Sequence, residues 1–472
     1  MIVNTYALNR SCNGDAVLFR PILYFLLGLE QWIFGYQFEY WQLTGILLHL
    51  LVLFVFFALL KFQPESRKKE RVDLWSHLLV FGVTLLFGVQ YISMEMVVWH
   101  HINGYLIFTC FLLAGILFLK YYISNQNYIF LSLSFLLILL SAFTYELGSI
   151  AGLLIAIYLF SLRWDKSIKL NWLNGLPFLA IPLVYTGLSL FDLHYRQYTA
   201  IPFPNFMEGS LVDTEIGLNL NNTQTTFINF LFKPLIYTII YVTIWASGGV
   251  IPSLYELKAG GRMRLAPQLP TFSLISIGLI IITVFLIIIL LKTRLFNIQK
   301  FKKELAYFLL LVGLLISYTE IIIYGRTLAK GWQNILANNL YYAYFFNILL
   351  FLSLYHFLTW CTSPHFLHKS RQTLFQLFLV FLMTFNILTN SAYVYAMNIK
   401  MIDFSRPILV LLERSLKTIQ AHSHEPDFSF KVEDRCEENT VLKWLNSYTL
   451  VEAVFPKFYS EENYKYIVPC KE

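Results

Sequence analysis

The feature that most constrains this chain is a series of apolar runs, each about 20 residues long, which is the length a helix needs to cross a bilayer. Residues 271–291, for example, contain no charged side chain. Lipid offers the backbone no hydrogen bonds, so runs of this length cross it as helices. Charged residues make up 13% of the 472 residues, whereas soluble proteins carry about 25%. The sequence therefore predicts an all-α, polytopic integral membrane protein.

Clusters of basic residues occupy short loops between the apolar runs, as the positive-inside rule describes for cytoplasmic loops. The clusters at 61–71, 163–169 and 292–303 predict three such loops, and they account for the net charge of +7 without nucleic-acid binding. We therefore expect a multi-pass protein of the cell membrane, most consistent with a bacterial inner or plasma membrane. The ten expected spans are residues 40–60, 74–92, 104–122, 128–144, 150–162, 172–191, 271–291, 305–323, 340–358 and 374–395.

This topology divides the chain into four regions. Residues 228–249 are apolar enough to cross, but a crossing would place the basic cluster that follows on the outer side. We therefore expect that segment to be a re-entrant or interfacial helix. The regions are an N-terminal module at 1–191 with about six spans and an interfacial helix at 20–35, an extracytoplasmic loop at 192–270, the C-terminal spans at 271–396, and a small extracytoplasmic tail at 397–472.

Glu95, His100 and His101 follow the predicted span 74–92, at the depth where it leaves the bilayer. Ionisable side chains at that depth are costly and mark a functional-site hypothesis. The alternative interpretation is that Glu95 braces the helix end by pairing with Arg20 or His100, and that both histidines are solvated.

The predicted topology places further ionisable residues at the same outer face. Arg20 and Arg326 offer planar guanidinium groups, which suit a lipid-linked phosphate, and His100 is a further candidate contact for it. A carboxylate there could accept the proton of an acceptor hydroxyl. We expect Glu146 to be an internal brace, and mid-span His49 to be a hydrogen-bonded core histidine.

Four short motifs follow one another in the N-terminal third of the chain. They are Phe19-Arg20-Pro21-Ile22-Leu23, then Gly45-Ile46-Leu47-Leu48-His49, then residues 86–99 with Leu86, Phe87, Glu95, Val97 and Trp99, and finally Leu140-Ser141 to Tyr145-Glu146. Together they resemble the GT-C membrane glycosyltransferases. The resemblance is to the branch that uses polyprenyl-phosphate sugars and includes the protein O-mannosyltransferases.

The resemblance implies a GT-C-like helical bundle that moves a sugar from a polyprenyl-phosphate donor to a glycan, lipid or protein hydroxyl at the outer face. It implies Glu95 or Asp15 as the catalytic base and Arg20 as a ligand of the lipid phosphate, to which the topology adds Arg326 and His100. A divalent cation is compatible with this chemistry, but the sequence contains no ligand cluster that demands one.

The chain also departs from the family pattern. Gln90, Tyr91 and Ser93 stand where relatives have His, Pro and His. Relatives carry their proposed catalytic Asp in a loop after a first helix; we expect that helix to be absent here, which makes Asp15 the only acid before Arg20. Two rival functions therefore stay open: a membrane transporter or lipid flippase, and a truncated, non-catalytic relative of the GT-C enzymes.

Overall fold

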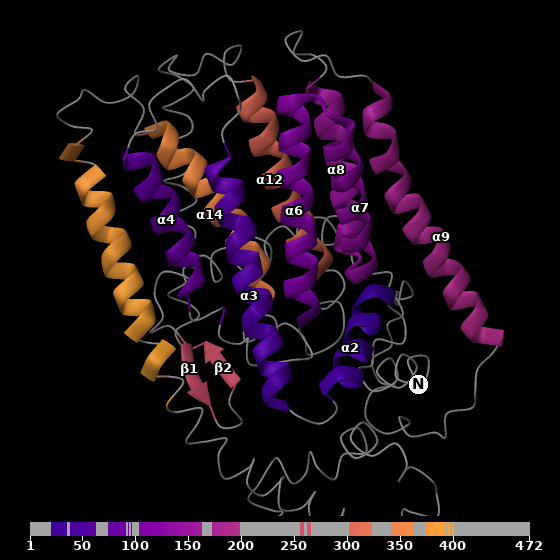
Figure 1. Ribbon diagram of the computed structural model, residues 1–472, viewed down its shortest axis with the longest axis horizontal. Coiled ribbons are helices and arrows are strands. Elements are labelled where there is room, and N and C mark those ends of the chain that lie inside the picture. Colours follow the sequence, from indigo (N-terminus) through magenta and orange to yellow (C-terminus); the bar gives the residue numbers. More distant parts are fainter. Residues whose placement is uncertain are drawn as a thin grey trace, which may run out of the picture.

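The computed structural model is a bundle of helices that lie side by side (Figure 1). The residues that it describes are 20–34, 38–62, 74–90, 93, 96, 103–162, 172–198, 255–258, 262–265, 302–322, 341–361, 373–374, 376–392, 394–396 and 399.

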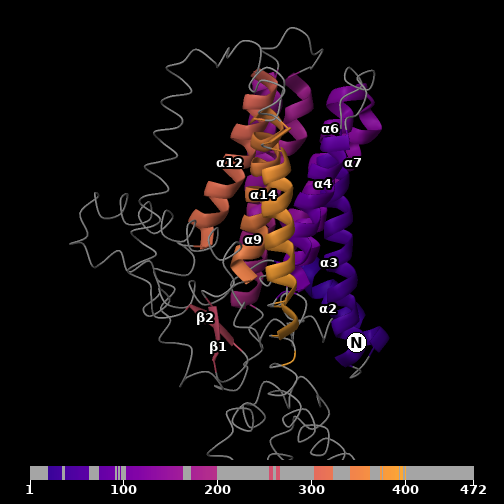
Figure 2. The same ribbon diagram turned by 90° about the vertical axis from the view of Figure 1, so that its left-hand side faces the viewer.

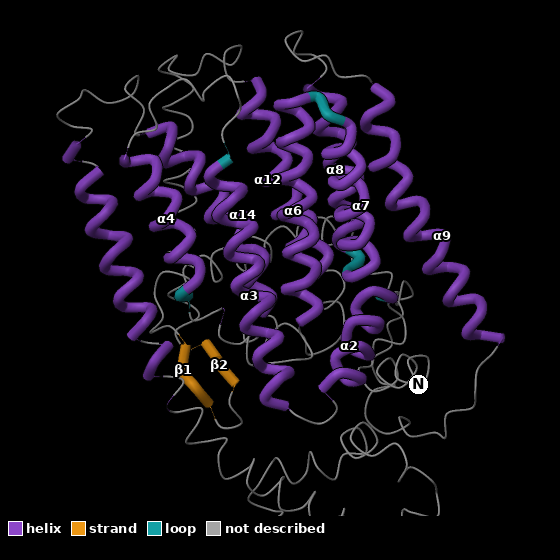
Figure 3. The backbone as a smooth tube through the Cα atoms, viewed as in Figure 1, coloured by secondary structure: helices purple, strands orange, loops and turns teal. Residues whose placement is uncertain are grey.

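Helices account for nearly all of these residues (Figure 3). The helices of the N-terminal part are α2 (Pro21–Phe34), α3 (Phe38–Lys61), α4 (Leu74–Gly88), α6 (Asn103–Asn125), α7 (Tyr128–Thr144), α8 (Leu147–Leu162), the 3-10 helix η3 (Trp172–Gly175) and α9 (Leu176–Tyr198). In the C-terminal part they include α12 (Lys302–Ile322) and α14 (Tyr341–Cys361).

Within the described part of the chain, four helices are long and apolar enough to cross a membrane: Tyr40–Lys61, Asn103–Asn125, Leu173–Phe191 and Gln376–Ala396. Several shorter apolar helices pack beside them. Large apolar side chains cover much of the outer surface of the bundle; Phe54 is 68% exposed and Leu183 is 74% exposed. Soluble proteins seldom expose so much contiguous apolar surface, so these faces suit contact with lipid.

Where the predicted spans fall on described residues, helices lie in their places and most differ only at their ends; the predicted span 271–291 lies outside the described residues. Helix α7 has the predicted bounds, and the side chain of Asn127 caps it by accepting a hydrogen bond from the Ile129 N–H at 2.9 Å. Helix α4 ends at Gly88 and not at residue 92, because the Gln90 N–H turns back to the Phe87 carbonyl at 3.3 Å. Helix α9 continues past residue 191, where the prediction placed the start of a loop.

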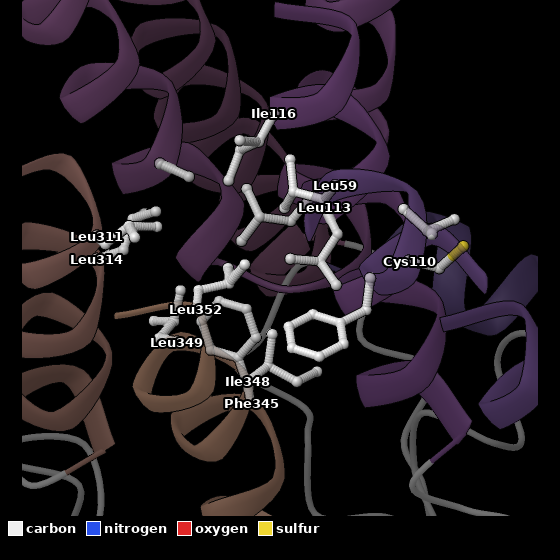
Figure 4. Packing of buried hydrophobic residues seen from close by; sticks show 14 of the residues in the cluster. Leu59, Cys110, Leu113, Ile116, Leu311, Leu314, Phe345, Ile348, Leu349 and Leu352 are labelled. Carbon is white, nitrogen blue, oxygen red and sulfur yellow. The ribbon is translucent and has the colours of Figure 1, made fainter. Parts of the chain in front are cut away.

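The core lies between α3, α6, α12 and α14 (Figure 4). Leu113 of α6, Leu314 of α12 and Leu352 of α14 are fully buried there, and Phe345 packs edge-on against Phe108 at 5.1 Å between ring centroids. Close helix contact elsewhere depends on small residues: a side chain at Gly115 of α6 would come within 2.6 Å of Ile138 in α7. The Phe108–Phe345 contact joins α6 to the C-terminal helix α14.

The all-α prediction is wrong at one place. Strands β1 (Tyr255–Lys258) and β2 (Arg262–Leu265) pair antiparallel, with Tyr255 opposite Leu265 and Lys258 opposite Arg262. The sequence does carry the signal, because apolar and charged residues alternate on both sides of Gly260 and Gly261. The prediction for 228–249 lies outside the described residues, as does the predicted tail at 397–472 apart from Ile399.

Two ends of the bundle are named below. The α2 end carries α2 and the hairpin β1–β2, which lie toward the same end in both views (Figures 1 and 2), and the turn at Tyr145 and Glu146 between α7 and α8, which Arg20 contacts just before α2. The α6–α7 end carries the turn at Gln126 and Asn127.

The turn between α7 and α8 is tight because Gly148 has no side chain. A Cβ at Gly148 would overlap the backbone of Ser141 and Ala142 and come within 2.5 Å of the Ser141 hydroxyl. Backbone atoms cannot move aside as a flexible side chain can. The position of Glu146 in this turn therefore depends on glycine at 148.

We predict that Gly148→Ala lowers the melting temperature of the detergent-solubilised protein and its folded yield. Gly187→Ala is the matched control, because a Cβ there meets nothing within 4 Å and alanine favours a helix over glycine by about 1 kcal/mol. Equal melting temperatures of the two variants would contradict the described packing of the α7–α8 turn.

Candidate functional site

Arg20 and Glu146 form a bidentate ion pair at the α2 end of the bundle. The guanidinium donates from Nε to Oε2 at 3.1 Å and from Nη2 to Oε1 at 3.0 Å. Arg20 is 4% exposed, and the Glu146 side chain is 28% exposed. The pair joins positions 126 residues apart in the chain, so it fixes the start of α2 against the α7–α8 turn.

The ring of Tyr145 forms the second contact of the guanidinium. The Arg20 Cζ lies 3.9 Å from the centre of this ring, which is a cation–π distance. Tyr145 is itself held by Tyr105, with ring centroids 4.3 Å apart, and by Phe108 at 5.9 Å. Arginine, unlike lysine, can donate two in-plane N–H bonds to a carboxylate while the face of its guanidinium stacks on an aromatic ring.

Backbone hydrogen bonds fix Glu146 in its turn. Its carbonyl accepts from the Ser149 N–H at 3.1 Å and from the Ser149 hydroxyl at 2.6 Å. The carbonyl of Tyr145 accepts from the Gly148 N–H at 2.9 Å. Both residues that contact Arg20 are therefore held by local bonds at the start of α8.

A second polar contact lies inside the bundle, at His49 of α3. Its Nε2 lies 3.3 Å from the Gly88 carbonyl at the end of α4, and its Nδ1 lies 2.8 Å from the Tyr344 hydroxyl of α14. A carbonyl can only accept, so Nε2 carries a proton. A neutral ring in this tautomer then accepts the Tyr344 O–H at Nδ1. His49 thus joins three helices, and the prediction of a hydrogen-bonded core histidine is confirmed.

Aromatic rings enclose this histidine. The ring centroid of Phe87 lies 6.2 Å from that of His49 and 5.2 Å from that of Tyr344. Phe56 and Phe351 also contact the Phe87 ring. Phe87 is fully buried. In so apolar an environment, a ring nitrogen or hydroxyl without a partner would be costly.

Of the predicted site residues, the structure describes only Arg20. Its partner is Glu146, the residue predicted to be an internal brace. The predicted site residues Asp15, Glu95, His100 and Arg326, like His101, lie outside the described residues. Sequence reasoning did not predict that Tyr145 contacts Arg20 or that Tyr344 bonds His49. No local pattern distinguishes either tyrosine from the chain's many others.

Among the described residues, no group of three or more histidines, cysteines or acids could hold a metal ion. Comparison with known proteins found no match among family models, curated proteins or solved structures.

We predict that Arg20 and Glu146 are energetically coupled. Arg20→Met and Glu146→Gln should each destabilise the protein by about 2 kcal/mol, because each leaves a half-buried or buried group without its partner. The double variant should lose less than the sum. Unfolding in mixed micelles with increasing SDS measures the four free energies. Strictly additive losses would show that the pair does not form.

Tyr344→Phe removes the hydroxyl that bonds His49 and should cost about 1 kcal/mol of stability in the same assay. Tyr307→Phe provides the comparison, because the buried Tyr307 hydroxyl has no hydrogen-bond partner and its removal should cost nothing. A loss in Tyr307→Phe that matched the loss in Tyr344→Phe would argue against the His49 contact.

Proposed function

We propose that this chain is a multi-pass membrane glycosyltransferase of the GT-C type. It moves a sugar from a polyprenyl-phosphate donor to a glycan, lipid or protein acceptor at the outer face of the cell membrane. The helices that are long and apolar enough to cross a membrane, and the apolar outer surface of the bundle, support a protein that handles a lipid-linked substrate.

One observation supports the proposal most: the four stretches that resemble the GT-C enzymes meet in pairs. Arg20 of the first stretch binds Glu146 of the fourth. His49 of the second stretch bonds the carbonyl of Gly88, which belongs to the third. The first pair joins positions 126 residues apart, so proximity in the sequence does not account for it. The contacts between the stretches favour a common origin in one structural module.

The Arg20 geometry suggests how the donor would bind. Glu146 bonds Nε and Nη2 of the guanidinium, and the Tyr145 ring covers its face at 3.9 Å. In the proposal the lipid phosphate lies beside this guanidinium, which Glu146 and Tyr145 hold in one orientation. Departure of the phosphate as an anion then takes place beside a fixed positive group.

The base in this proposal is Glu95 or Asp15, which accepts the proton of the acceptor hydroxyl as that oxygen attacks the sugar carbon and the polyprenyl phosphate leaves. Attack from the side opposite the phosphate inverts the configuration at that carbon. The acceptor approaches along the region that contains residues 192–226, as the predicted topology suggests.

We predict that Glu95→Gln or Asp15→Asn, whichever removes the base, lowers sugar transfer by about 100-fold or more. The assay uses the full chain in proteoliposomes with undecaprenyl-phosphate mannose or glucose, tritiated in the sugar, and a membrane extract as the source of acceptor. Glu30→Gln is the control, because Glu30 is an acid within α2 to which the proposal assigns no part in the reaction.

Label leaves the lipid fraction only if transfer occurs. Full turnover in both acid variants would overturn the assignment of the base. Movement of intact labelled lipid between leaflets without transfer to any acceptor would overturn the glycosyltransferase proposal in favour of a flippase.

A further inference from the structure

Lys120 lies among aromatic rings near the α6–α7 end of the bundle, far from the Arg20 pair. Its Nζ is 4.1 Å from the centre of the Tyr307 ring and 5.8 Å from that of Phe62. The ring of Tyr307 also contacts His356 at 5.2 Å and Tyr158 at 6.3 Å between centroids. The ammonium of Lys120 therefore contacts one ring of α12 and the ring of Phe62 after α3, and rings of α8 and α14 pack against Tyr307.

These residues share one depth in the bundle. Lys120 lies five residues before the end of α6, Tyr307 five residues after the start of α12, and His356 five residues before the end of α14. At 1.5 Å per residue this is about 8 Å below the helix ends. From this depth a lysine side chain can extend its ammonium toward the headgroup phosphates.

Two polar groups in this cluster have no described partner that neutralises or bonds them. No ion pair or hydrogen bond of Lys120 is found among the described residues, where it has ring contacts alone. Tyr307 is 6% exposed, and its hydroxyl has no hydrogen-bond partner. Buried polar groups are nearly always bonded, and an ammonium inside a bundle needs an anion or water.

Snorkelling of the lysine explains only part of this arrangement. A lysine near a helix end can bury its stem and keep its ammonium at the interface, and the ring faces add cation–π attraction. Neither effect accounts for the Tyr307 hydroxyl, which is buried on the same ring that the ammonium covers. A ligand that accepts hydrogen bonds from both groups explains the two observations together.

We propose that Lys120 and Tyr307 form a binding site for a phosphate group, carried by the headgroup of an anionic lipid or by a free phosphate ion. The ammonium keeps donors that the ring faces do not use, and the phenol adds a neutral donor. Phosphate oxygens accept from both kinds of donor. Basic pockets between membrane helices bind lipid headgroups in this way. The site does not depend on the proposed glycosyl transfer, which concerns the opposite end of the bundle.

The test uses the full chain in nanodiscs of phosphatidylcholine with phosphatidylglycerol, released for native mass spectrometry to count the anionic lipids retained per protein. Lys120→Gln should weaken retention of one phosphatidylglycerol by about tenfold, and Tyr307→Phe by about fivefold, as loss of one hydrogen bond predicts. Lys61→Gln is the matched control, because Lys61 is exposed at the end of α3 and contacts only Phe57 among the rings, at 5.8 Å.

A second arm separates the two sources of phosphate. Inorganic phosphate is titrated into nanodiscs of phosphatidylcholine alone and observed by phosphorus NMR; binding that Lys120→Gln abolishes assigns the site to the free ion. If phosphatidylglycerol stays bound when inorganic phosphate is added, and this binding requires Lys120, the site is assigned to the lipid. If Lys120→Gln fails to fold, Tyr307→Phe carries the test, since it removes a single oxygen. Unchanged lipid retention and unchanged phosphate binding in the folded variants overturn the proposal.

Discussion

The bidentate bond between Arg20 and Glu146 fixes the geometry of one end of the bundle. A charge at that depth is costly alone, so each residue requires the other, and the Tyr145 ring covers the face of the guanidinium. Because the two residues stand 126 positions apart, their bond holds the start of α2 against the turn between α7 and α8. That turn exists in its observed form because Gly148 lets the backbone of α8 approach the end of α7.

The described polar contacts are arranged differently at the two ends and in the middle of the bundle. At the α2 end the Arg20 guanidinium binds the Glu146 carboxylate. In the middle, His49 donates to the Gly88 carbonyl and accepts from the Tyr344 hydroxyl. Near the α6–α7 end, Lys120 has only aromatic rings among the described residues. Arg20 and His49 thus have polar partners within the chain, whereas the ring contacts of Lys120 are the ground for the anion site that we propose there.

Hydropathy alone predicted most of the helices, because a span in lipid must be apolar over a fixed length; α7 was placed to the residue. Helix ends were less predictable: hydrogen bonds decide them, as at Gln90 after α4. The hairpin β1–β2 was missed, since its short alternating strands were interpreted as loop. The site was predicted in part. Arg20 was singled out from its position before Pro21, but one sequence contains no signal that its partner is Glu146.

The contacts between the motif stretches are the ground for proposing a GT-C enzyme, and the donor phosphate is the ligand that would connect them to chemistry. The most direct measurement is a cryo-electron microscopy structure of the full chain in a nanodisc with undecaprenyl phosphate. The proposal predicts a phosphate oxygen within about 3 Å of an Arg20 nitrogen, with Glu146 still bonded to Nε. Phosphate bound only elsewhere, with Arg20 and Glu146 unchanged, would contradict it.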